Sequence, residues 1–258
     1  ACSPVPGLIH RYPDRALLVL TRSCAVHCRH CMRKRLWTRS TEEVLPPERL
    51  DDAIAYVDRT PGLREVILSG GDPMLLPVEQ LESVLARLHA CPGVEVVRIG
   101  TRVPVVLPCR LTSAFCDRLG KYRPTWVVTH FNHPAELSGE AAEACGRLIR
   151  AGMPILNQTV LLRGVNDSTE TLQTLFTGLL RMRVKPYYLF HGDPVTGTSH
   201  FRTGIDKGLQ LIASLEGRVS GMALPTFALD LPDGGGKVPL LPNRETGTRN
   251  RGGERVFQ

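Results

Sequence analysis

Three cysteines stand close together in the stretch "CAVHCRHCMRKR". Cys24 and Cys28 are four positions apart, and Cys31 follows Cys28 by three. Thiolates at such spacings hold zinc or an iron–sulfur cluster. A closed zinc site needs a fourth ligand, which His27 or His30 could supply, whereas three thiolates on a four-iron cluster leave one iron open for another molecule. No second Cys or His pair with zinc-finger spacing follows, so we favour the open cluster over structural zinc and over free thiols.

The cysteine loop runs into Arg33, Lys34 and Arg35, and a basic nucleic-acid patch is therefore a further interpretation. The chain of 258 residues carries a net charge of +7, but its cations are spread along the sequence. No aromatic stacking platform accompanies the basic run. A non-enzymatic zinc or RNA-binding module is thus the distant alternative to an enzyme.

Short β-rich runs alternate with helical patterns along the chain. The predicted strands are 16–21, 65–69, 94–100, 125–130, 155–162, 185–190 and 225–231, and the predicted helices are 46–60, 78–90, 111–122, 138–152, 168–182 and 203–217. Six βα units and a terminal strand predict a parallel sheet with helices outside. An open doubly wound sheet and an incomplete barrel both satisfy this pattern.

The unusual polar residues follow the predicted strands at their carboxyl ends. They are the cysteine loop, "GGDP" at 70–73, Thr101 and Arg102, His130, Gln158, Asp193, Asp230 and Lys237. Parallel α/β folds place their sites at this end of the sheet. The sequence therefore predicts one site on one rim.

Composition predicts one intracellular domain. The 42% hydrophobic content suffices for a single core. No apolar run approaches the roughly 20 residues of a membrane span, and no signal-peptide pattern opens the chain. Three of the eight cysteines cluster and the others scatter, which favours a cytoplasmic metal site over a disulfide scaffold. We expect a core at 1–242 and a polar extension at 243–258.

The cysteine spacing resembles the signature of radical S-adenosylmethionine (SAM) enzymes, and "SGGDP" resembles their glycine-rich motif. By itself, Gly70-Gly71 would predict only a tight turn. The blocks "HRYPDRALLVLTRSCAVHCRHCMRKR", "SGGDPML", "RIGTRVPVVLP", "THFNHPAEL", "NQTVLLRGVND", "KPYYLF", "SHFRT" and "DGGGKVP" together resemble lysine 2,3-aminomutase. The resemblance implies an α/β fold, a partial (β/α)6 TIM-like barrel of the radical SAM type with a terminal extra strand and loop. It also implies a [4Fe–4S] cluster, SAM and pyridoxal 5′-phosphate (PLP).

The resemblance assigns roles to individual residues. Lys237 matches the lysine that binds PLP in the family, although without the resemblance it would be read as a solvent-exposed loop residue. Arg11, Tyr12 and Arg15 match a segment that binds the PLP phosphate. Arg15 could instead be an ordinary surface charge. The SAM contacts are assigned to Gly70, Gly71, Asp72, His130 and Gln158, with His30 and Arg102 as weaker candidates. Without the resemblance, His130 would be read as a core histidine whose hydrogen bonds are made within the protein.

The implied substrate contacts are Arg33, for a carboxylate, and Asp193 and Asp230, for a side-chain ammonium. Either aspartate could instead cap a turn. Pro194 departs from the family pattern after the first aspartate, which leaves the substrate less defined.

The implied activity is that of an isomerase, an intramolecular aminotransferase that moves the α-amino group of L-lysine from C2 to C3. Arginine, ornithine or glutamate as substrate, or supply of β-lysine for translation-factor modification, are alternatives. Such an enzyme needs a reducing electron donor, and a homo-oligomer is left open.

Overall fold

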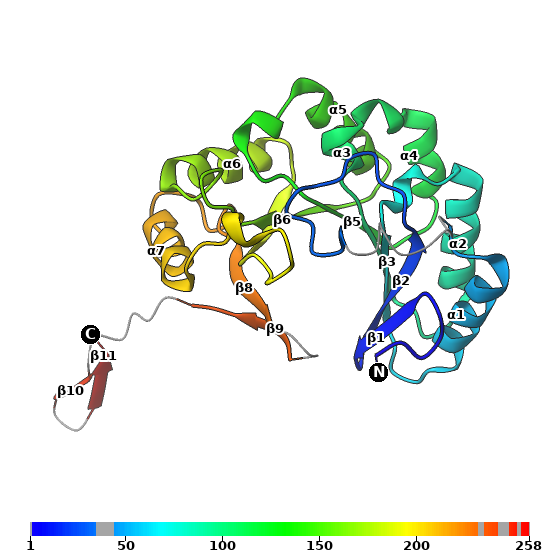
Figure 1. Cartoon of the computed structure of the whole chain (residues 1–258), viewed down its shortest axis with the longest axis horizontal. Helices are drawn as coiled ribbons and strands as arrows, with labels where there is room; N and C mark the ends of the chain where they lie inside the picture. Colours follow the sequence, from blue (N-terminus) through cyan, green and yellow to red (C-terminus); the bar gives the residue numbers. More distant parts are fainter. Residues whose placement is uncertain (1, 35–43, 232–234, 242–247, 252–253, 258) are drawn as a thin grey trace.

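The computed structural model of the chain describes residues 2–34, 44–231, 235–241, 248–251 and 254–257. Arg35, part of the glycine-rich stretch (232–234) and part of the predicted extension lie outside these residues. The described elements form a curled sheet with helices along its outer side (Figure 1).

The main sheet has nine strands that follow one another in chain order. They are β1 (Leu8–Tyr12), β2 (Arg15–Thr21), β3 (Glu65–Gly70), β4 (Val96–Gly100), β5 (Thr125–Thr129), β6 (Ile155–Val160), β7 (Lys185–Phe190), β8 (Thr226–Leu231) and β9 (Gly236–Pro239). Strands β2 to β8 are parallel, and β1 and β9 are antiparallel edges. A doubly wound sheet reverses its strand order at a switch point, and this sheet does not. The predicted incomplete barrel is confirmed.

Helices cover the convex side of the sheet (Figure 1). The helices are α1 (Pro47–Arg59), α2 (Val78–Ala90), α3 (Val103–Val106), α4 (Ser113–Leu119), α5 (Gly139–Arg150), α6 (Thr169–Arg181) and α7 (Ile205–Leu215), with 3₁₀ turns at Pro73–Leu75, Pro108–Arg110, Pro134–Glu136 and Ser199–Phe201. The six predicted helices are present with small shifts at their ends. In α2 the buried residues Leu81, Val84, Leu85 and Leu88 recur at helical spacing, which gives the helix one apolar face for the sheet.

Along each strand, side chains alternate between the core under the helices and the concave face of the sheet. In β4, Val97 and Ile99 are buried in the core, while Arg98 between them is only half-buried. In β8, Phe227 faces α7, because a Cβ added at Gly208 would lie 2.1 Å from its ring. Successive strand residues point to opposite faces, so Arg98 and Asp230 lie on the concave face.

The two edge strands were not predicted. Neither β1 nor β9 shows a long apolar alternation, and each is held by pairing with a neighbouring strand. Lys237 therefore lies on a strand, directly opposite Asp230, and not in a loop as expected. Within the extension, β10 (Thr248–Arg251) and β11 (Glu254–Phe257) pair with each other.

Among the described residues, no helix combines the length and the apolar character that a membrane crossing requires.

Candidate active site

The cysteine loop follows β2 and is half-buried at all three thiols. The backbone N–H of Cys31 donates to the Cys28 carbonyl oxygen at 3.0 Å, and the N–H of Arg33 donates to Cys31 Sγ at 3.4 Å. Arg102 Nη1 donates to Cys28 Sγ at 2.9 Å. The Arg102 guanidinium thus lies beside Cys28. Burial raises the pKa of Cys24 and Cys31 and the charge of Arg33 lowers it, so both arginines would offset the negative charge of thiolates that hold a cluster.

All three thiols are free, so each is available as a ligand. Across the described ranges, no group of three His, Cys, Asp or Glu side chains is arranged to hold a single metal ion. The support for an iron–sulfur cluster is therefore the loop's chemistry and the family described below.

Gly70 and Gly71 let the end of β3 lie directly against the start of the cysteine loop. Gly71 N–H donates to Thr21 O at 2.6 Å, and the next N–H, of Asp72, donates to Ser23 O at 2.8 Å. Gly70 has φ +126°, and a Cβ at Gly71 would lie 2.1 Å from Ser23 O. The glycines therefore position the loop that begins at Cys24, in addition to any contact with SAM.

Asp72 is buried just after β3, and its carboxylate connects the end of β3 to the residues that follow β4. Its carboxylate accepts hydrogen bonds from Thr101 Oγ1 at 2.7 Å, from Arg102 N–H at 2.7 Å and from Met74 N–H at 3.1 Å. Burial raises the pKa of Asp72, and these hydrogen bonds oppose that rise. Its predicted contact with SAM stays a prediction.

Arg33 lies over the end of β3. Its Nη1 donates to Ser69 Oγ at 2.7 Å and to Gly70 O at 3.0 Å. The predicted carboxylate-binding arginine is therefore placed at the rim, between the cysteine loop and the glycine turn.

His130 and Gln158 extend the rim across β5 and β6. Burial, with a smaller effect from the charge of Arg102, lowers the pKa of His130 to about 3. Burial also lowers the pKa of His30 to about 4. Both imidazoles are thus neutral at physiological pH and can accept as well as donate a hydrogen bond.

Lys237 lies in an aromatic and cationic environment. Its Nζ is 4.5 Å from the ring centroids of both Tyr188 and Phe190. Burial lowers the pKa of Lys237, Asp230 raises it, and Arg98, Arg15 and Arg11 lower it. A lowered pKa makes the neutral, nucleophilic amine easier to reach.

The predicted phosphate segment lies beside Lys237. Tyr12 Oη accepts a hydrogen bond from the Lys237 backbone N–H at 3.0 Å, and the Arg15 guanidinium stacks 4.1 Å from the Tyr12 ring centroid. Arg11 Nη2 donates to Leu231 O at 3.2 Å, while its buried Nε has no hydrogen-bond partner.

Asp193 and Asp230 come together on the same side as Lys237. Burial raises the pKa of Asp193, Asp230 raises it further, and His191 and Lys237 lower it. The two carboxyl groups therefore lie within electrostatic range of each other. The structure thus joins the two predicted substrate acids.

Sequence reasoning missed several residues at this site. Arg98, Tyr188 and Phe190 point to the concave face, and Glu65 pairs with Arg98. The available signal was strand alternation, since a charged residue between Val97 and Ile99 must face away from the core.

Lys34, which had no predicted role, connects two loops. Its Nζ donates to Arg29 O and to Gly197 O, both at 3.3 Å. Arg29 also lies 5.2 Å from the Phe201 ring centroid. The cysteine loop is therefore held against the loop that carries Asp193.

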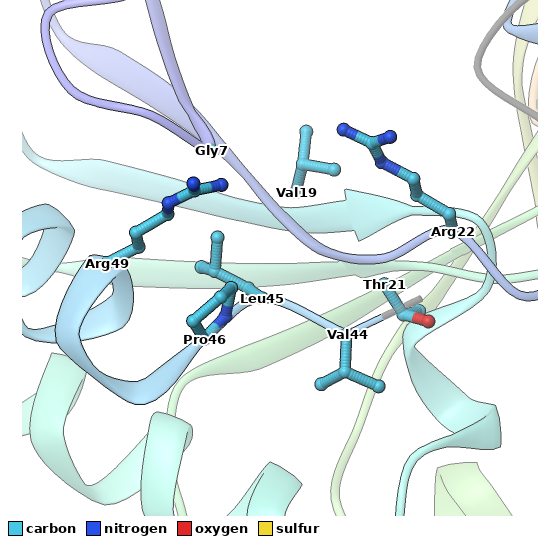
Figure 2. A pocket seen from close by; sticks show the side chains of 8 residues that line it. All are labelled: Gly7, Val19, Thr21, Arg22, Val44, Leu45, Pro46 and Arg49. Atoms are coloured by element: carbon cyan, nitrogen blue, oxygen red, sulfur yellow. The ribbon is translucent and has the colours of Figure 1, made fainter. Parts of the chain in front are cut away.

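A small pocket of about 50 Å³ lies between β2 and the start of α1 (Figure 2). Figure 2 shows Arg22 and Arg49 among its lining side chains. None of the predicted site residues lines it. The candidate active site is instead the concave rim of the sheet.

Residues 18–175 match the profile of the Radical SAM superfamily, and residues 212–248 match that of Lysine-2,3-aminomutase. The chain belongs to the radical SAM superfamily. The superfamily's cofactors, a [4Fe–4S] cluster and SAM, agree with the predicted ones.

Within that superfamily, the predicted resemblance to lysine 2,3-aminomutase is confirmed. The chain is 51% identical over 240 residues to the L-lysine 2,3-aminomutase of Fusobacterium nucleatum, covering 93% of this chain and 56% of that protein. It is 42% identical to the glutamate 2,3-aminomutase of Clostridioides difficile, covering 93% of this chain and 57% of that protein. The chain thus spans little more than half the length of these relatives.

Among solved structures, Streptococcus suis SuiB bound to S-adenosylmethionine superposes with a TM-score of 0.61 at 13% identity, covering 87% of this chain and 52% of that chain. This likeness shows the fold alone.

Proposed function

We propose that this chain is the catalytic core of an aminomutase that converts L-lysine into β-lysine, with SAM as radical source and PLP as amino carrier. The observation that carries the proposal is the placement of two interacting carboxyl groups, Asp193 and Asp230, beside Lys237. Lysine brings a second ammonium group that such a pair can hold.

The residues present fit the cofactors. Cys24, Cys28 and Cys31 would hold the cluster, and the adjoining rim would hold SAM, which together supply a radical when bound. Lys237 would hold PLP, which supplies a carrier for the migrating amino group. The arginines beside Lys237 offer donors suited to a phosphate, and the buried Nε of Arg11 is free to take one.

The remaining residues of the chain orient the substrate and exclude water. Arg33 would bind the substrate carboxylate near the cysteine loop, and Asp193 and Asp230 would hold the distal ammonium. Two charged anchors fix the position of the carbons between them, which matters because a radical attacks whichever C–H bond lies nearest.

Glutamate is the rival substrate, since one relative is a glutamate 2,3-aminomutase. Its side-chain carboxylate would meet the carboxylates of Asp193 and Asp230, and like charges repel. We therefore favour lysine as the substrate of an enzyme that acts in the cytoplasm with a reducing electron donor.

The test is anaerobic incubation of the reconstituted chain with SAM, a reductant and, separately, lysine, arginine, ornithine and glutamate. We expect a β-amino acid from lysine. Protein that stays free of iron and PLP after reconstitution would refute the enzyme assignment, and product from glutamate alone would refute the substrate.

The role of Asp230 is tested by Asp230→Asn. We expect lysine turnover to fall at least tenfold while SAM cleavage changes little, because the carboxylate contacts the substrate and not SAM. Asp51→Asn, which alters an exposed carboxylate on α1 paired with Arg87, is the matched control. Equal losses of turnover and SAM cleavage would remove the proposed role.

A further inference from the structure

Arg98 is a cation in the middle of the concave face. It lies on β4, opposite Ile67 of β3 and Trp126 of β5. Its side chain is only 16% exposed. Nothing in the resemblance assigned it a role, yet among the arginines near Lys237 it acts most strongly on that lysine.

The guanidinium of Arg98 has one donor in an ion pair and one buried donor without a partner. Its Nη2 donates to Glu65, which is 25% exposed, while its buried Nε has no hydrogen-bond partner. A guanidinium has five N–H donors, and leaving a buried one unpaired costs about 1–3 kcal/mol. A ligand anion would remove that cost.

The surroundings define the ligand as an anion with several acceptor oxygens. Arg98 on β4, Arg15 on β2 and Arg11 on β1 all act on Lys237, so three guanidinium groups from different strands converge on it. A phosphate accepts from several guanidinium forks at once.

The geometry points to Arg98 on β4 as a phosphate-binding residue that anchors PLP together with Arg11 on β1 and Arg15 on β2, with Glu65 orienting its guanidinium. This inference rests on the proposed function. It adds a contact from an interior strand, β4, to those predicted from the N-terminal segment. In this proposal Arg98 contacts the cofactor phosphate, and Glu65 holds Arg98 in position.

The experiment compares PLP with pyridoxal, which has the same aldehyde but no phosphate. Binding to the whole chain is followed by the visible absorption of the bound cofactor and by reductive trapping on Lys237, neither of which needs turnover. In the unaltered chain we expect PLP to bind much more tightly than pyridoxal. In Arg98→Met we expect PLP affinity to fall about tenfold to a hundredfold, the range for a hydrogen bond to a charged group, and pyridoxal affinity to stay within twofold.

Three further variants separate a phosphate contact from a general loss of structure. Arg98→Lys keeps the positive charge but loses the planar set of guanidinium donors, and we expect a smaller loss of PLP affinity than in Arg98→Met. Glu65→Gln keeps an acceptor for Arg98 and should keep the preference for PLP. Arg64→Met, at an exposed arginine paired with Glu95, is the charge-matched control and should change nothing.

The outcomes distinguish failure of the proposed function from failure of the Arg98 inference alone. Failure of the unaltered chain to bind PLP would overturn the proposed function. Normal PLP binding with equal losses of PLP and pyridoxal in Arg98→Met, or with no loss in it, would overturn this inference alone.

Discussion

The hydroxyl of Tyr12 accepts a hydrogen bond from the backbone N–H of Lys237 at 3.0 Å, although 225 positions separate them in the chain. Tyr12 ends β1 and Lys237 lies on β9, the two edge strands of the sheet. A second link runs from Arg11 to the carbonyl oxygen of Leu231. The open side of the barrel is therefore spanned by side chains, and these are the side chains predicted to bind PLP.

Tyr12→Phe should weaken this link. The substitution removes the hydroxyl that accepts from the Lys237 N–H, so we expect the free energy of unfolding to fall by about 1 kcal/mol. We also expect several-fold weaker PLP binding, measured by absorption. Tyr56→Phe, which removes a hydroxyl bonded to His10, is the control and should lower stability without changing PLP affinity. Equal effects of both variants on PLP binding would contradict the proposed role of Tyr12.

Gly71→Ala should disturb the cysteine loop. The new methyl group would lie 2.1 Å from Ser23 O, so the backbone just before Cys24 must move. We expect iron and sulfide content after anaerobic reconstitution to fall by more than half. Gly139→Ala, at a helix position with open space around the new methyl group, should leave the cluster content unchanged. Full cluster content in Gly71→Ala would show that the loop tolerates the shift.

The pH dependence of stability should carry the signature of Asp193. Its folded-state pKa is raised by burial and by Asp230, so its proton is bound more tightly in the folded chain than in the unfolded chain. The stabilisation is complete below the ordinary pKa of 3.8 and is lost as pH rises through the raised value. In the ligand-free chain, unfolding monitored by denaturant should therefore show a decline in stability over that range.

Asp193→Asn should abolish that decline and raise the melting temperature at neutral pH. The amide carries no charge to repel Asp230. Lysine should stabilise the unaltered chain more than the variant, because the substrate ammonium is expected to relieve the repulsion. A melting temperature that is lower in the variant at neutral pH would show that the Asp193 carboxylate stabilises the fold.

Lys34→Met should loosen the loop that carries Asp193. Lys34 Nζ bonds to carbonyl oxygens of both loops, and methionine keeps the stem but loses both bonds. We expect amide hydrogen exchange in residues 191–198 to rise several-fold. Lys207→Met, at an exposed position in α7, is the control. Unchanged exchange in Lys34→Met would mean that other contacts hold the loop.

The parallel core of the fold could be predicted because its strands and helices carry their own patterns. Strands such as "EVILS" are apolar and bounded by turns, and α2 repeats its apolar residues at helical spacing. The strands β1 and β9 escaped prediction because pairing, and not their composition, makes them strands. The choice between an open sheet and a barrel also depended on strand order, which periodicity does not encode.

The sequence by itself determined the chemistry that is available: three thiols at short spacing, a glycine pair after the next strand, and polar residues at strand ends. Those properties are local, and composition and spacing record them directly. Only the tertiary structure decided which groups act together. It brought Lys237 to Tyr12 and Arg98, and it engaged Asp72 with Thr101, because the curvature of the sheet determines which distant strand ends and side chains meet.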